Sequence, residues 1–299
     1  MRSSVRFRIS SRGGGREITL LGQTVNSWHE PGADAEASKS ESRTAASTSR
    51  FAGLLRRISQ EVPDLQRLRY TSPHPRHITP ELVAAHTELD VLPAHVHLPV
   101  QSGSNRLLRR MARRYTAEDY IARTDALKRA KPGLTLSSDF IVGFPGETES
   151  DFEQTLELVR RVGFVAAFAF KYSPRPYTPA LKLGDEVSEE VKDERLARLF
   201  AVIATQQSAH LQSLVGQELQ VLVEGPSPGD TGRFAGRSER NEIVHLMAPE
   251  GYDPTGELVA VTIDEPYRHS LSGYMADAAG LPERGRRTHL SVLDAGGAS

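Results

Sequence analysis

Apolar runs and helical patterns alternate along the first two thirds of the chain. Five short runs have the continuous or alternating hydrophobicity of strands buried in a parallel sheet. They lie at residues 18–21, 65–70, 94–100, 134–142 and 164–172. Apolar positions at helical spacing predict helices between them, at residues 51–60, 79–86, 105–112, 117–130 and 149–162. Because βα crossovers are right-handed, every strand should end at one rim, which indicates an incomplete βα barrel or an open parallel sheet.

Residues 134–152 are the segment around which this pattern is organised. The strand ends in a turn that contains Gly143 and Glu147, and Thr148 then begins the next helix as its capping residue. Ligands of parallel α/β proteins bind at the carboxyl ends of strands, so we expect a site near this turn, with Ser138 and Asp139 pointing outward. An ordinary βα loop explains the glycines equally well.

The periodicity changes near residue 215. A helix at residues 188–214 is followed by strand-like runs at 219–223, 241–246 and 257–263, which predict a separate small β-domain over 215–274. The α/β domain would span residues 16–214, with a flexible insertion at 30–50. Residues 1–15 are expected to form a disordered basic arm and residues 275–299 a disordered tail.

The composition of the chain limits the partners and the kinds of site that its residues can form. The chain has 299 residues, 38% of them hydrophobic, and 37 basic against 38 acidic residues, so contacts with nucleic acid must come from local patches. No run is long enough for a transmembrane helix, and we expect a cytoplasmic protein without a membrane partner. The chain contains no cysteine, which excludes disulfides, zinc–thiolate sites and thiol catalysis by its own residues.

Two groups of arginines are candidate phosphate contacts. The first has helical spacing, which predicts one shared helix face just past residues 101–104, where the third predicted strand ends: Arg106, Arg109, Arg110 and Arg113. The second belongs to the small β-domain: Arg233, Arg237, Arg240 and Arg268. A solvated charged surface is the alternative for both groups.

Five segments carry a family resemblance. They read REITLLGQTVNSW, HLPVQSGSNRLLRRMARRYTAEDY, SSDFIVGFPGETESDFEQTL, FKYSPRPYTPA and VLVEGPS followed by TGRFAGRSERNEIVHL. Together they resemble the radical S-adenosylmethionine methylthiotransferases over about residues 16–274, most closely the branch that acts on tRNA. The resemblance implies a partial (β/α) radical-SAM-type barrel, here without its first strand, followed by a small OB-like TRAM domain that grips tRNA. It also implies methylthiolation of an isopentenyladenosine next to the anticodon; modification of a ribosomal protein is the alternative specificity.

The resemblance implies that both arginine groups bind RNA. It also implies that residues at the strand ends bind the cofactor, S-adenosylmethionine. Those residues are Gln23, Asn26, Gln101, Ser102, Asp139, Gly143, Glu147, Ser173, Arg175 and Thr178. The chain has Tyr177 where relatives usually have glycine, so a loop that needs positive φ would have to be rebuilt there.

The chain departs from the family in its cysteines. Family members hold an auxiliary iron–sulfur cluster in an amino-terminal domain and a second 4Fe-4S cluster on a Cys-x-x-x-Cys-x-x-Cys loop after the first barrel strand. This sequence enters the pattern at the second strand and has neither set. Reductive cleavage of S-adenosylmethionine needs such a cluster, so we expect weak or absent cofactor binding and no methylthiotransferase activity from the isolated chain.

Three hypotheses remain open. The chain is part of an enzyme whose missing half comes from a separate chain, a tRNA-binding module without catalysis, or a non-functional remnant. The remnant hypothesis predicts poor solubility and a broad unfolding transition, because a barrel without its first strand exposes a sheet edge.

Overall fold

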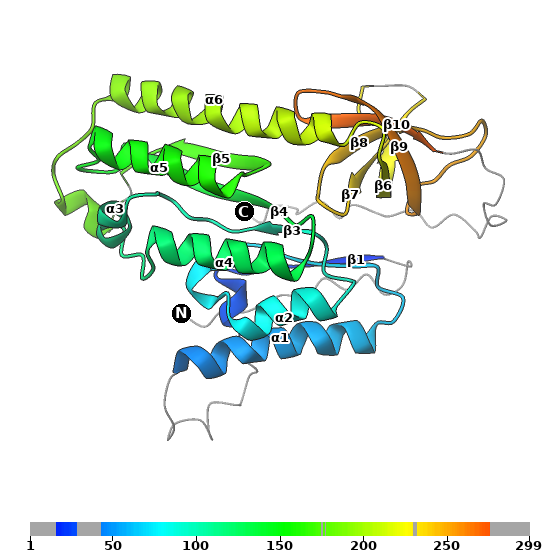
Figure 1. Cartoon of the computed structure of the whole chain (residues 1–299), viewed down its shortest axis with the longest axis horizontal. Helices are drawn as coiled ribbons and strands as arrows, with labels where there is room; N and C mark the ends of the chain where they lie inside the picture. Colours follow the sequence, from blue (N-terminus) through cyan, green and yellow to red (C-terminus); the bar gives the residue numbers. More distant parts are fainter. Residues whose placement is uncertain (1–15, 29–42, 175, 177, 230–231, 276–299) are drawn as a thin grey trace, which may run out of the picture.

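The computed structural model of the protein describes residues 16–28, 43–174, 176, 178–229 and 232–275. It has two parts, a larger α/β part and a small β-barrel beside it, connected by a long helix (Figure 1). The expected disordered arm and tail, and most of the expected insertion, lie outside the described residues.

All five predicted strands of the α/β part are present and parallel. β1 (Glu17–Leu20) pairs with β2 (Arg67–Tyr70), and β3 (His95–His97), β4 (Thr135–Val142) and β5 (Ala166–Lys171) form a three-stranded sheet in that order. Between the two sheets the Leu68 amide donates to the Val91 carbonyl oxygen at 2.7 Å. The parallel α/β prediction is therefore confirmed, with an interruption between β2 and β3 that the sequence did not indicate.

The helices follow the predicted order, with short 3-10 turns at the loops. The helices are α1 (Arg43–Glu61), α2 (Pro80–Glu88), α3 (Asn105–Arg110), α4 (Ala117–Ala130), α5 (Glu149–Val162) and α6 (Glu189–Ser213); the turns are η1 (Val25–Ser27), η4 (Pro75–His77) and η5 (Pro179–Lys182). Thr116 and Thr148 each complete a capping box at the start of α4 and α5, which is why both helices begin where the sequence predicts. None of the helices in the described ranges combines the length and apolarity needed to cross a membrane.

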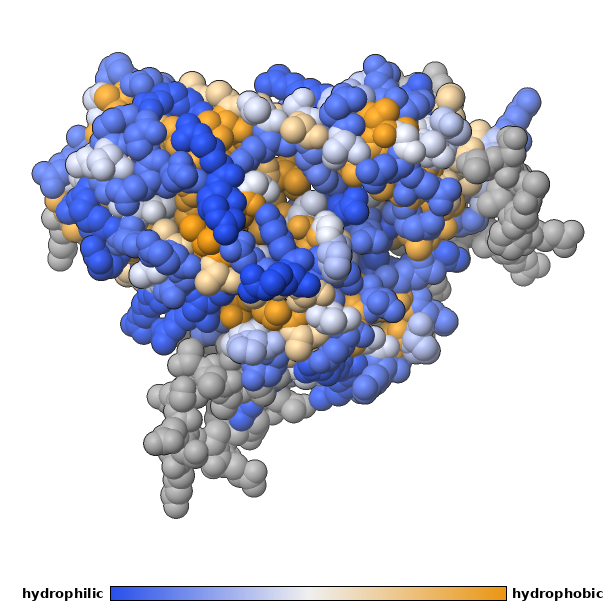
Figure 2. All heavy atoms as spheres, viewed as in Figure 1, coloured by the Kyte–Doolittle hydropathy of each residue, from blue (hydrophilic) through white to orange (hydrophobic). Residues whose placement is uncertain are grey.

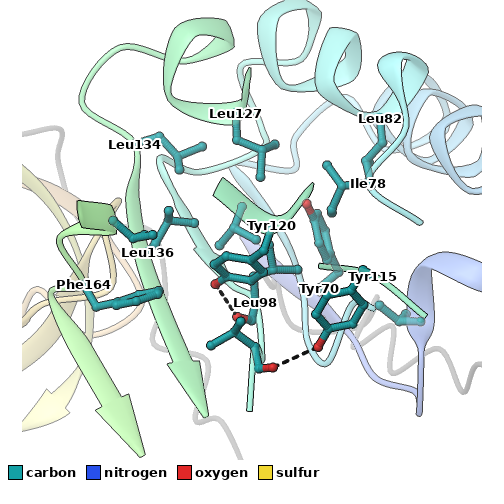
Figure 3. Packing of buried hydrophobic residues seen from close by; sticks show 14 of the residues in the cluster. Tyr70, Ile78, Leu82, Leu98, Tyr115, Tyr120, Leu127, Leu134, Leu136 and Phe164 are labelled. Carbon is teal, nitrogen blue, oxygen red and sulfur yellow. Dashed lines mark hydrogen bonds between the residues drawn. The ribbon is translucent and has the colours of Figure 1, made fainter. Parts of the chain in front are cut away.

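The main core lies between these helices and one face of the strands. It joins apolar residues from the strands with residues from α1, α2, α4 and α5. Figure 3 shows Tyr120 and Tyr115 inside it; their hydroxyls donate to the carbonyl oxygens of Leu98 at 2.8 Å and Val100 at 2.9 Å. Each ring thus buries apolar surface while its polar group keeps a partner. On the outside, hydrophilic residues cover most of the face in view and hydrophobic residues form separate patches (Figure 2).

The small part is a closed barrel of five strands, two more than the sequence indicated. The strands are β6 (Glu218–Pro226), β7 (Phe234–Ser238), β8 (Ile243–Met247), β9 (Leu258–Pro266) and β10 (Ser270–Met275). The missed strands, β7 and β10, each contain a buried glycine, Gly236 and Gly273, where an added Cβ would collide with the backbone of a neighbouring strand. These positions hold glycine because a neighbouring backbone lies too close for a side chain, so the apolar pattern that predicts a strand is interrupted there.

Arginines attach the barrel to the α/β part. The buried Arg67 guanidinium donates to the carbonyl oxygens of Gln220 and Arg237, both at 2.7 Å, and Arg69 donates to Ser238 O at 3.0 Å. From the opposite direction, Arg240 Nε donates to Gly133 O at 3.1 Å. Charged hydrogen bonds to main-chain oxygens fix the placement of the two parts, since backbone acceptors cannot rotate away.

Candidate functional site

The carboxyl ends of the strands meet along one rim. The Asn26 side chain, after β1, donates to His74 O at 3.0 Å and accepts from His74 N at 2.8 Å, which joins the first two strand ends. Gln101 bridges to Phe140 in parallel pairing, so the chain after β3 follows β4. The rim expected from right-handed crossovers is therefore present.

Alternation along β4 separates two faces of the sheet. Ser138 is fully buried, and its hydroxyl donates to Leu98 O and accepts from Val100 N. Asp139 is on the opposite face, away from the helices, with its side chain 30% exposed. The expectation that both residues point outward was wrong for Ser138, because successive strand residues face opposite sides.

A line of hydrogen-bonded side chains crosses this open face, which is the face of the sheet opposite the helices. His95 contacts Thr135 Oγ1 at 2.9 Å and Ser137 Oγ at 3.0 Å, and Ser137 Oγ contacts His97 Nδ1 at 2.9 Å. The line ends with His97 Nε2, 3.3 Å from Asp139 Oδ1. Burial lowers the pKa of His95 to about 3, so this ring is neutral at neutral pH. The site thus presents one carboxylate at the end of a hydrogen-bonded line that contains the neutral His95 ring.

Two aromatic side chains lie on the same face. Phe168 and Phe170 of β5 are in register with Asp139 and Ile141 of β4, and the Phe168 ring packs edge-on against His97 with centroids 6.1 Å apart. Sequence reasoning missed these rings and both histidines. The signal was the i, i+2 spacing in the segments HVH and FAF, which places both members of each pair on one side of a strand.

The glycine turn after β4 is supported from within the protein. Glu147 accepts from the Gly143 amide at 2.6 Å and pairs with Arg195 Nη1 at 2.9 Å, and both side chains are buried. Burial raises the pKa of Glu147, opposed by the Gly143 amide and the Arg195 charge. The Cα of Gly143 faces Lys192, where a Cβ would collide with the lysine stem. Gly143 and Glu147 therefore shape the rim, and their direct contact with a cofactor stays a prediction.

The other predicted cofactor residues have different surroundings. Ser102 is fully buried against Thr155, with 3.3 Å between their hydroxyl oxygens, and Asn26 is occupied by His74 as described. Gln101 has a φ of 75° and little exposure. Gln23 and Ser173 are exposed and Thr178 is half-buried beside η5, whereas Arg175 and Tyr177 lie outside the described residues. Cofactor contacts by these residues stay predictions.

The first arginine group does not form one helical face. Helix α3 ends at Arg110, and Ala112 has a φ of 56°, which turns the chain before Arg113. Arg106 is bound to the Asp151 carboxylate and to Gly146 O, and Arg109 is exposed. The single shared face was a wrong prediction, because helical spacing beyond the end of a helix carries no directional meaning.

The second arginine group is divided over the small barrel. Arg237 pairs with Glu224 at 3.2 Å, and Arg240 binds the α/β part through Gly133. Arg233, before β7, donates to Ser272 Oγ at 3.0 Å, and Arg268 is exposed between β9 and β10. Phosphate contact by these residues stays a prediction, and Arg268 is the most accessible of them.

The residues present do not fit an iron–sulfur cluster. Such clusters are held by cysteine thiolates, and the chain contains none. Within the described ranges, no group of three or more histidine and carboxylate side chains is placed to hold a metal ion. The Asp139 carboxylate can accept hydrogen bonds from the hydroxyls of a nucleoside, and its contact with S-adenosylmethionine stays a prediction.

Comparison with known proteins gives two family matches. The Radical SAM superfamily matches residues 6–159, and the TRAM domain matches residues 212–276.

Curated relatives cover most of this chain. A protein of Sorangium cellulosum named tRNA-2-methylthio-N(6)-dimethylallyladenosine synthase is 53% identical over 95% of this chain and 60% of its own length. Proteins with the same name from Bordetella petrii and Acidithiobacillus ferrooxidans are each 44% identical, over 90% and 91% of this chain and 54% and 57% of their own lengths. The chain thus spans between half and two thirds of the relatives it matches.

Proposed function

This chain belongs to the Radical SAM superfamily and carries a TRAM domain, and from that premise we propose that it is the tRNA-binding barrel portion of a tRNA methylthiotransferase. Its substrate would be tRNA that contains N6-dimethylallyladenosine. The chain would bind the RNA and hold the acceptor nucleoside, and it would not ligate an iron–sulfur cluster with its own residues. The observation that carries the proposal is 53% identity to a synthase of this name across 95% of the chain.

The fixed placement of the two parts supports this function. Arg67, Arg69 and Arg240 hold the TRAM barrel against the α/β part through main-chain oxygens. An RNA bound to the TRAM barrel would therefore keep a constant position relative to the rim. A constant position is what a nucleotide-modifying protein needs to bring one base to one site.

The exposure and the existing partners of each arginine indicate which of them are accessible to RNA and which have a structural role. We propose that Arg109 and Arg268, both exposed, contact phosphates together with Arg233. Arg106 and Arg240 have structural partners, Asp151 and Gly133, so their main role is to hold loops and domains. RNA contacts by Arg110, Arg113 and Arg237 stay part of the proposal without a geometric argument that favours them.

The proposal is tested by tRNA binding to the purified chain across a salt series. Binding should weaken linearly in log salt, and a variant with Arg109→Ala, Arg233→Ala and Arg268→Ala should show a slope smaller by roughly 2–3. Arg56→Ala is a matched control. Arg56 belongs to α1 and pairs with Glu88 of α2, outside both arginine groups, so its removal should leave the slope unchanged. Absence of tRNA binding at low salt would overturn the proposal.

A second function, full catalysis by the chain alone, makes a different prediction. An active radical SAM enzyme produces 5′-deoxyadenosine from S-adenosylmethionine under reducing conditions. We expect no 5′-deoxyadenosine above a protein-free control after iron and sulfide reconstitution, because the chain has no thiolate ligands. Production above that control would show that other residues replace them.

A further inference from the structure

Two exposed phenylalanines lie two residues apart on strand β5, on the same face of the sheet. Phe168 is 59% exposed and Phe170 is 57% exposed, whereas the alternate residues Ala167 and Ala169 pack against the core. Exposing two large rings on one face forfeits the free energy that burial would supply, and the sheet alternation directs both to the open face. The pair therefore indicates a binding surface.

Polar groups lie directly beside the rings. Phe168 is in register with Asp139 and contacts His97, and the His97–Asp139 pair lies at the end of the hydrogen-bonded line through Ser137 and His95. An aromatic face with a fixed hydrogen-bond acceptor at its edge matches a nucleobase, which has an apolar face and a polar edge.

We propose that this surface is the pocket for the modified adenine of the RNA, extruded from its stack. The purine ring would stack on Phe168, the dimethylallyl group would lie on Phe170, and the remaining N6–H would donate to Asp139. This assignment rests on the proposed function, because the dimethylallyl substituent comes from the substrate that the relatives' name specifies. Base–aromatic stacking and one charge-assisted hydrogen bond supply the affinity.

His97, Ser137 and His95 are positioning residues for Asp139. His95, Ser137 and His97 are hydrogen-bonded in sequence, and His97 Nε2 lies 3.3 Å from Asp139 Oδ1, so the carboxylate has a neighbour held in place before the base arrives. Ser137→Ala would break the line at its middle while the rings and the carboxylate remain. We expect it to lower the preference for N6-dimethylallyladenosine over an N6,N6-dialkylated adenosine, which has no N6–H to donate.

The test is direct binding of the free nucleoside N6-dimethylallyladenosine, followed by ligand-observed NMR and calorimetry. The variant with Phe168→Ala and Phe170→Ala should lose at least about tenfold in affinity. Phe200→Ala is the matched control, because Phe200 is 42% exposed on α6, and it should bind as the parent chain does. Unmodified adenosine should bind more weakly and be insensitive to Phe170→Ala alone.

The possible failures separate cleanly. If the parent chain does not bind the nucleoside at millimolar concentration, or the double variant binds within twofold of Phe200→Ala, the pocket is overturned. If S-adenosylmethionine loses binding in the double variant and the nucleoside does not, the rings belong to the cofactor and the pocket is also overturned. The salt series with tRNA tests the proposed function independently, and the double variant should leave its slope unchanged. Trp28 fluorescence confirms that each variant is folded, because this tryptophan is buried in the α/β core.

Discussion

Replacing Arg195 by methionine should destabilise the α/β part strongly. The Arg195 side chain is 5% exposed and its partner Glu147 is 1% exposed, with 2.9 Å between Nη1 and Oε2. Arg195 Nη1 also donates to the Glu147 carbonyl oxygen at 3.1 Å. Methionine keeps much of the packing volume, but it leaves a buried carboxylate that has lost its cationic partner and still accepts from the Gly143 amide.

The expected cost follows from that burial. Removing one partner of a buried ion pair costs about 3–5 kcal/mol, because the other charge stays desolvated. Arg198 supplies the comparison on the same helix. Its side chain is 35% exposed and pairs with surface carboxylates such as Glu194, and it also lies over the Phe152 ring. Arg198→Met should cost no more than about 1 kcal/mol.

The assay is urea unfolding followed by Trp28 fluorescence. The chain has a single tryptophan and it lies in the α/β core, so the signal reports on this part and not on the TRAM barrel. With a slope of about 2 kcal/mol per molar urea, the midpoint of Arg195→Met should fall by about 2 M. That of Arg198→Met should fall by less than about 0.5 M.

The pH dependence gives the reasoning a second check. Without Arg195, the folded-state pKa of Glu147, already raised by burial, should rise further above its unfolded value of 4.5. The folded state then binds the extra proton, so the loss of stability is small below pH 4.5 and grows as pH rises through the folded pKa. Equal costs for the two methionine variants, or a cost independent of pH, would refute the argument from burial.

Three further predictions concern packing, protonation and domain attachment. Gly143→Ala should cost more than Gly163→Ala, by about 1–3 kcal/mol in urea unfolding; both glycines have φ +70°, but only the added Cβ at residue 143 meets another side chain, that of Lys192. Burial lowers the pKa of His86 from 6.5 to about 3. The stability that neutral His86 contributes is therefore complete above pH 6.5, and it falls by up to about 1.4 kcal/mol per pH unit on acidification. The stability of His86→Gln should depend less on pH, and identical pH profiles for the variant and the parent chain would contradict this. Arg67→Ala should release the TRAM barrel and increase proteolysis between the two parts by at least about tenfold, because two carbonyl oxygens lose their buried donor; unchanged proteolysis would show that the other contacts suffice.

The sequence was informative wherever local chemistry sets local structure. The threonine caps at residues 116 and 148 begin α4 and α5 as predicted, because a capping box needs only four consecutive residues. The five strands of the α/β part were visible because short apolar or alternating runs recur between the helical patterns. In the TRAM barrel the apolar pattern did not predict β7 and β10, because each contains a glycine against which the backbone of a neighbouring strand packs.

The candidate site was only partly predictable. Asp139 was identified from its place at a strand end, and the structure puts it on the open face with its side chain partly accessible. His97 and Phe168 come from strands separated from Asp139 in the sequence, and only sheet register brings them beside it. Arginine spacing was misleading for Arg113, because the end of helix α3 was not evident from the sequence.

The sequence alone determined the order of elements, the family pattern and the lack of thiolate ligands, since each depends on residue identity and near neighbours. The tertiary structure decided which polar groups are already used. It assigned Arg240 to a domain contact and Glu147 to a buried ion pair, and it left Asp139 and Phe168 on an accessible face. The physical reason is that a side chain's availability depends on the partners that folding brings to it, and these lie far away along the chain.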